Sequence, residues 1–138
     1  MTDLHPTDFL NRADELAPVP NADSTRDAWI RHYAAQAMAA HAAFRLSERT
    51  EPAGPHLGYL VSLGVAATAA VVAMETLEDH VAEALWKVTP EAGALNGEWI
   101  DFLADTLELH DISPADLYPW FEASDFTPPA RLPKVEVA

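Results

Sequence analysis

Two long segments without a charged residue constrain the fold of this chain more than any other feature of its sequence. Residues 32–44 contain no Asp, Glu, Lys or Arg, and seven of these thirteen positions are Ala. Residues 57–74 form a second uncharged run of eighteen residues. Because a helix that faces solvent normally carries charges, two bare helices have to be buried, and each is expected to cover the other.

The second run is near the minimum length for spanning a bilayer, but its composition argues against that role. Much of it is Ala, Gly, Ser and Thr, and Glu51 and Glu75 flank it in place of the expected basic residues. The N-terminus, Met-Thr-Asp-Leu-His-Pro, has neither the basic nor the apolar part of a signal peptide. We therefore expect no membrane association and a cytoplasmic location.

Proline, glycine and capping residues divide the chain into helical segments, and no run has the alternation of a strand. The sequence predicts an all-α fold: a small helical bundle built on a long Ala-rich antiparallel helical hairpin with shorter flanking helices. Expected helices cover about 6–16, Ser24 (as the cap) to about 49, 56–88, 97–110 and a short segment from Ser113-Pro114. Residues 1–126 are predicted to form one domain, and the proline-rich residues 127–138 an extended tail.

Apolar residues recur every three or four positions along the longest predicted helix and predict a seam for helix packing. Because one hairpin cannot cover two bare helices completely, either the flanking helices wrap it or a second copy packs on it. We favour a homodimer, with a monomer wrapped by its own termini as the alternative. The predicted dimer seam consists of Leu60, Leu63, Ala67, Ala70, Met74, Leu77 and Val81.

The strongest electrostatic feature is an acidic run near the C-terminus, in a chain of 138 residues with a formal charge of -14. Eight acids fall within residues 98–125 with no Lys or Arg between them, and aromatic residues are interleaved with them. Such a surface suits docking of a basic protein, because opposite charges steer and orient association. The candidate partner-binding residues are Glu98, Asp101, Asp105, Glu108, Asp116, Trp120 and Phe121.

His32 and His41 lie in the uncharged part of their predicted helix, nine residues apart, which is too far for them to share a metal ion without another chain. In a symmetric dimer either could meet its own mate, so both are candidate pH-sensitive residues. An acidic cluster with His80 lacks the Glu-x-x-His spacing of a carboxylate-bridged metal site. Zero Cys excludes thiolate ligands, and no Gly-x-Ser-x-Gly frame marks a nucleophile.

These patterns predict no catalytic residue, no metal and no cofactor. We interpret the chain as a non-enzymatic protein-binding or regulatory domain, dimeric, with a protein partner that is basic. Direct binding to nucleic acid is not expected, because only eight Lys and Arg are scattered along the chain. Two alternatives stay open: an acidic DNA mimic or inhibitor of a basic nucleic-acid-binding protein, and a carboxylate and histidine metal-binding bundle.

Overall fold

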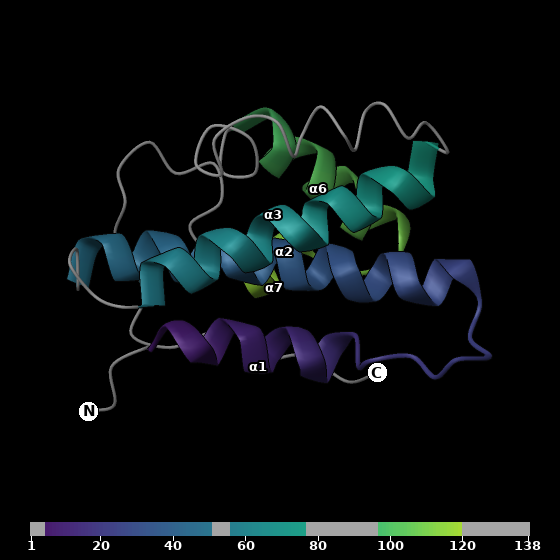
Figure 1. Cartoon of the computed structure of the whole chain (residues 1–138), viewed down its shortest axis with the longest axis horizontal. Helices are drawn as coiled ribbons and strands as arrows, with labels where there is room; N and C mark the ends of the chain where they lie inside the picture. Colours follow the sequence, from purple (N-terminus) through teal and green to yellow (C-terminus); the bar gives the residue numbers. More distant parts are fainter. Residues whose placement is uncertain (1–4, 51–55, 77–96, 120–138) are drawn as a thin grey trace.

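The computed structural model describes residues 5–50, 56–76 and 97–119, and these residues form helices without a strand (Figure 1). Their side chains are described at 5–47, 58–72, 74 and 100–119. The predicted all-α class is confirmed for this part of the chain. No described helix combines the length and the apolar character needed to cross a membrane. The helices are α1 (Pro6–Leu16), α2 (Arg26–Thr50), α3 (His56–Thr76), α6 (Gly97–Leu109) and α7 (Pro114–Leu117).

Helix α1 begins and ends where the sequence predicts. Pro6 occupies the first helical position, where its missing N–H costs no helical hydrogen bond. The backbone N–H of His5 donates to Oδ2 of Asp8 over 2.8 Å, which fixes the entry into the first turn. Phe9 and Ala13 are buried on one side of the helix. This amphipathic helix therefore packs as the hydrophobic spacing requires.

The predicted cap of α2 is wrong by one residue. Ser24 does not cap the helix, because its hydroxyl donates to Oδ1 of Asn21 and accepts the Asn21 backbone N–H. Instead the backbone N–H of Ala28 donates to Oγ1 of Thr25 over 3.3 Å, as expected when Thr25 is the N-cap. The local turn around Asn21 competes for Ser24, so the neighbouring hydroxyl takes the capping role.

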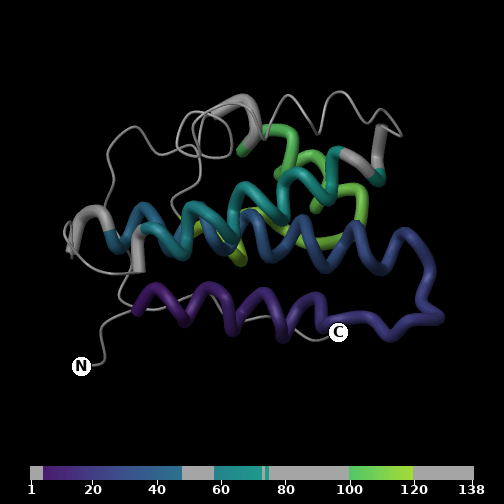
Figure 2. Tube along the Cα trace, viewed as in Figure 1, coloured from purple at the N-terminus to yellow at the C-terminus, as the bar shows by residue number. Residues whose placement is uncertain are grey.

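Helix α2 is the central element, and α1, α3, α6 and α7 all pack against it. Figure 2 shows α1 and α3 following different sides of α2. Its uncharged middle is therefore covered by the chain's own helices. The alanines on it leave room for neighbouring backbones to come close, while Met38 and the core leucines of the other helices fill the space between them. The buried alanines of α2 are Ala34, Ala35, Ala37, Ala39, Ala40, Ala42 and Ala43.

Two polar side chains of α2 join the ends of α1 and α6. The guanidinium of Arg31 donates to the backbone O of His110 over 2.7 Å and to the backbone O of Leu16 over 3.1 Å. Nδ1 of His32 lies 2.9 Å from the backbone O of Ala17. Carbonyls at a helix C-terminus lack helical partners and carry partial negative charge, so one cation stabilises two helix ends.

Helix α3 lies along α2 and runs in the opposite direction (Figure 1). Leu60, Ala67 and Val71 join the main core, while Val61 and Val65 pack against Phe44 of α2. The predicted continuation of this helix to residue 88 lies outside the described residues, as does the predicted tail at 127–138.

Candidate functional site

Three carboxylates line one side of α6. Asp101, Asp105 and Glu108 are exposed, and their spacing of four and then three residues puts them on one helix face. Leu103 and Leu107 on the other face are fully buried in the core. The helix thus separates apolar and acidic sides as its sequence pattern predicts.

An exposed leucine lies on the same side as these carboxylates. Leu109 follows Glu108, four positions after Asp105, and 79% of its surface is exposed. A lone exposed leucine is common on protein surfaces, and this one follows Glu108, one of the residues that line a pocket at the end of α6. Leu109 is not among the partner-binding residues predicted from the sequence, although its position four residues after Asp105 indicates the same side of the helix.

The C-terminus of α6 is closed by a compact turn in which Asp111 adopts a left-handed backbone conformation, with φ of 62°. The backbone N–H of Ile112 donates to O of Leu107 over 2.9 Å, and that of Asp111 donates to O of Glu108 over 3.2 Å. This pair of bonds is the Schellman motif, and the contact between Ile112 and Leu107 in the core completes it. The turn therefore fixes Asp111 beside the exposed side of α6.

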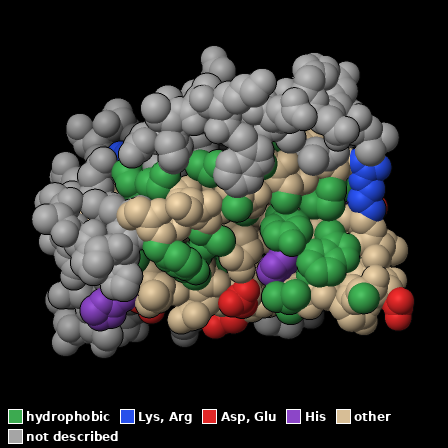
Figure 3. Space-filling model, in the orientation of Figure 1, with side chains coloured by type: hydrophobic (Ala, Val, Ile, Leu, Met, Phe, Trp, Pro, Cys, Tyr) green, Lys and Arg blue, Asp and Glu red, His purple; other side chains and the backbone are tan. Residues whose placement is uncertain are grey.

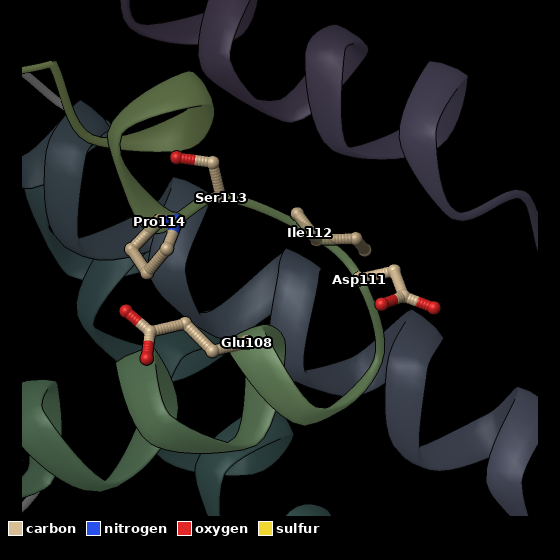
Figure 4. A pocket seen from close by; sticks show the side chains of 5 residues that line it. All are labelled: Glu108, Asp111, Ile112, Ser113 and Pro114. Atoms are coloured by element: carbon tan, nitrogen blue, oxygen red, sulfur yellow. The ribbon is translucent and has the colours of Figure 1, made fainter. Parts of the chain in front are cut away.

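An open pocket of about 270 Å³ lies where this turn joins α7. Its lining residues are Glu108, Asp111, Ile112, Ser113 and Pro114. Figure 4 shows Glu108 reaching from α6 toward Pro114, with Asp111 at the other end of the loop. The Glu108 carboxylate beside the apolar ring of Pro114 suits a cationic side chain with an aliphatic stem, such as Lys or Arg. We call Asp101, Asp105, Glu108, Leu109 and Asp111 the acidic surface.

Positive charge is scarce around the acidic surface. Residues 97–119 contain six acids and no Lys or Arg. No carboxylate of this surface forms an ion pair within the part of the chain that the structure describes; the ion pair found there joins Arg12 and Glu15 on α1. Arg31 reaches the end of α6, but it is engaged with backbone carbonyls. Among the described residues, the carboxylates of the acidic surface are therefore open to water, ions or a partner.

Of the other predicted partner-binding side chains, the structure describes only that of Asp116. Asp116 is half-buried in the first turn of α7. Glu98 lies at the start of α6, with its side chain outside the described set. Trp120 and Phe121 lie outside the described residues altogether.

Both candidate pH-sensitive histidines are buried inside the chain. His32 contacts the rings of Trp29 and Tyr33, with ring centroids 6.2 and 5.2 Å away. His41 is 1% exposed, and its Nε2 atom has no hydrogen-bond partner. Desolvation by burial lowers the pKa of His41 from 6.5 to about 3, because a buried imidazolium loses its hydration. At neutral pH this side chain is a neutral core group.

The predicted dimer seam is divided between core and surface. Leu60 and Ala67 lie in the chain's own core, whereas Leu63, Ala70 and Met74 are half-buried. Leu77 and Val81 lie outside the described residues. Part of the seam is therefore already used within one chain, packed against α2.

Among the described residues, no group of three or more His, Asp or Glu side chains is arranged to hold a metal ion. Comparison with family models, with curated proteins and with solved structures gives no match to this chain.

Proposed function

We propose that this chain is a non-enzymatic protein-binding domain whose acidic surface docks a basic protein. The observation that carries the proposal is the row of exposed carboxylates on α6, which ends beside the exposed Leu109 and the pocket at Pro114. Their side chains project from α6, whose other face is buried in the core. The helix backbone therefore holds the carboxylates at fixed spacing before a partner binds. A rigid, preorganised surface loses little entropy on binding.

Charge explains how such a surface finds its partner. With a formal charge of -14, the chain attracts basic proteins from a distance and repels acidic ones. Exposed charges are screened beyond about 8–10 Å at physiological salt, so this attraction speeds encounter and weakens as salt rises. An apolar contact at Leu109 adds affinity that salt does not remove.

A second proposal of the same kind is a DNA mimic, which occupies the nucleic-acid site of a basic protein by charge alone. The variant Leu109→Ala distinguishes a DNA mimic from a protein-binding adaptor. A mimic that relies on carboxylates tolerates Leu109→Ala, whereas an adaptor that seats a partner on the acidic surface loses affinity. We favour the adaptor, because the exposed Leu109 directly follows Glu108 at the end of the row of carboxylates.

We also propose that the domain works as a homodimer, since α3 has an exposed side without charges in a chain that is otherwise strongly acidic. Two copies would present two acidic surfaces to a basic partner. Such bivalency raises avidity without any new contact, provided that both surfaces engage at once.

The test uses a synthetic basic peptide as probe, with Lys and Arg on one face of a helix and Leu on the other. Its affinity is measured by fluorescence anisotropy at about 50 and about 300 mM NaCl, which changes the screening length roughly twofold. The native chain is expected to bind at low salt and to lose at least roughly tenfold in affinity at the higher salt.

Matched variants locate the binding. Neutralising the acidic surface with Asp101→Asn, Asp105→Asn and Glu108→Gln together should reduce affinity at low salt by roughly tenfold or more. A control with the same charge change replaces the exposed acids Glu15, Asp23 and Asp27 by their amides. Equal loss in both variants would mean that only net charge matters, and it would refute docking at α6.

A further inference from the structure

Two aromatic side chains stack on each other along α2, one helical turn apart. The ring centroids of Trp29 and Tyr33 are 5.9 Å apart, and the two ring planes differ by 25°. Both side chains are half-buried, and the buried ring of His32 meets each of them edge-on. Figure 3 shows large hydrophobic side chains gathered beside a histidine on the face of the molecule that α1, α2 and α3 form. We call Trp29, His32 and Tyr33 the aromatic patch.

The rings of the aromatic patch are held in place by the chain itself. Nδ1 of His32 lies 2.9 Å from the backbone O of Ala17, and because a carbonyl oxygen only accepts, Nδ1 donates the hydrogen bond. Tyr33 packs against the main core, and Trp29 stacks on Tyr33. The ring positions are therefore set before a ligand arrives, so ordering them on binding costs little entropy.

Each of the two stacked rings carries a hydrogen-bond donor that is not used within the chain. Among the described residues, neither Nε1 of Trp29 nor the hydroxyl of Tyr33 has a hydrogen-bond partner, and neither atom is buried. Tyr and Trp with an apolar body and an accessible polar end are typical of binding surfaces. The aromatic patch thus combines apolar ring surface with two free donors, and a ligand that fits it has apolar groups and free acceptors.

The free donors favour one backbone conformation of a peptide ligand. The backbone carbonyls of a helix are already bonded within the helix. An extended strand binds by pairing with a sheet edge, and the described residues of this chain include no strand. A polyproline II segment has no internal hydrogen bonds, so all its carbonyls are free, and its proline rings pack against aromatic side chains.

We propose that the aromatic patch binds a proline-rich segment of a partner protein in the polyproline II conformation. Proline rings of the segment pack against the rings of Trp29 and Tyr33, while the indole N–H and the phenol O–H donate to its carbonyls. Because proline has no backbone N–H, the segment brings few donors that this surface would have to satisfy. The aromatic patch is a second binding surface, on α2 and separate from the acidic surface on α6.

A carboxylate lies one turn of α2 beyond the aromatic patch. Gln36 follows Tyr33 by three residues, and its Nε2 donates to Oδ1 of Asp14 on α1 over 2.9 Å. Asp14 is exposed and forms no ion pair in the part of the chain that the structure describes. A segment with Arg or Lys beside its prolines can pair with this carboxylate, whereas the formal charge of -14 disfavours acidic segments.

The probe is a synthetic octaproline peptide, which has no charged side chain and so does not depend on the acidic surface. It is titrated into the ¹⁵N-labelled full chain, and the indole N–H signal of Trp29 is identified by its loss in Trp29→Phe. We expect this signal to shift in a saturable manner, and binding to be at least roughly tenfold tighter than that of a control peptide of alternating Gly and Ser. Absence of saturable shifts, or equal affinity for the control peptide, would overturn the proposal.

Conservative variants test the two donors. Trp29→Phe and Tyr33→Phe keep an aromatic ring and remove one donor each, so each should weaken octaproline binding about fivefold. Tyr59→Phe removes a hydroxyl from the exposed tyrosine of α3 and should leave the affinity unchanged. Circular dichroism checks that all three variants fold. An equal loss in Tyr59→Phe, or no loss in either patch variant, would show that the peptide does not bind through these donors.

Asp14→Asn tests the end of the site. An octaproline peptide with an added terminal Arg should bind the native chain more tightly than octaproline does, and Asp14→Asn should remove this gain without changing the affinity for octaproline itself. A gain that persists in Asp14→Asn and disappears when Asp101, Asp105 and Glu108 are neutralised would place the Arg on the acidic surface and overturn the role of Asp14.

Discussion

The buried imidazole of His41 predicts that this chain loses stability in mild acid. Its side chain lies in the uncharged middle of α2, and its Nε2 atom has no hydrogen-bond partner. Because burial lowers the pKa of His41 from 6.5 to about 3, the folded chain resists protonation at this residue. The sequence suggests that His41 makes dimerisation sensitive to pH. We propose instead that His41 makes folding sensitive to pH.

The sign and the size follow from proton binding. Between pH 6.5 and about 3 the unfolded chain protonates His41 and the folded chain does not, so the stability from a neutral His41 is complete above 6.5 and falls with decreasing pH. For a group with these two pKa values, the free energy of unfolding falls by about 2 kcal/mol from about pH 8 to about pH 5.

Urea unfolding followed by circular dichroism measures this change in the native chain and in His41→Leu. Leu has a similar volume and no polar atom, so the variant should be more stable at both pH values and should lack the extra loss of about 2 kcal/mol at about pH 5. Carboxylates titrate alike in both chains and cancel in the comparison. The exposed His5→Gln is the control and should behave like the native chain. Equal acid sensitivity of the native chain and His41→Leu would refute the reasoning.

Three further predictions concern stability and are measured by the same unfolding assay. Asp111→Gly should stabilise the chain by about 1 kcal/mol, because Gly adopts positive φ without strain and the change removes a negative charge from a helix C-terminus; a loss of stability would contradict this account. Arg31→Met should cost about 2 kcal/mol by leaving two helix-end carbonyls without a donor, and no change would show that water replaces the guanidinium. Ala42→Leu in the core should cost about 2 kcal/mol, whereas Ala115→Leu on the surface should change stability by less than about 0.5 kcal/mol.

Helix positions could be predicted from the sequence because local chemistry determines them. Pro6 starts α1, Pro114 starts α7, and the acids of α6 alternate with buried leucines at helical spacing. The cap of α2 could not be assigned, because both Ser24 and Thr25 are good capping residues. Only the turn formed by Asn21 decides between them.

The contacts between helices could not be predicted from the helical spacing of apolar residues. The uncharged middle of α2 predicts burial, but it cannot tell a neighbouring copy from the chain's own α1, α6 and α7. Arg31 donates to the backbone carbonyls of Leu16 and His110, which lie far from it in the sequence. Because every residue has a backbone carbonyl, the sequence does not indicate which carbonyls this side chain contacts. The exposed acids of α6 could be predicted, whereas the turn that fixes Asp111 beside them depends on a backbone conformation unusual for Asp.

Docking of a basic partner on the acidic surface is tested most directly by mapping the contact. Nuclear magnetic resonance spectra of the ¹⁵N-labelled chain are recorded during titration with the basic helical peptide. We predict that the largest amide shift changes fall on residues 101–116 and disappear when Asp101, Asp105 and Glu108 are neutralised. Changes centred on α1, or changes of equal size along the whole chain, would contradict the proposed docking surface.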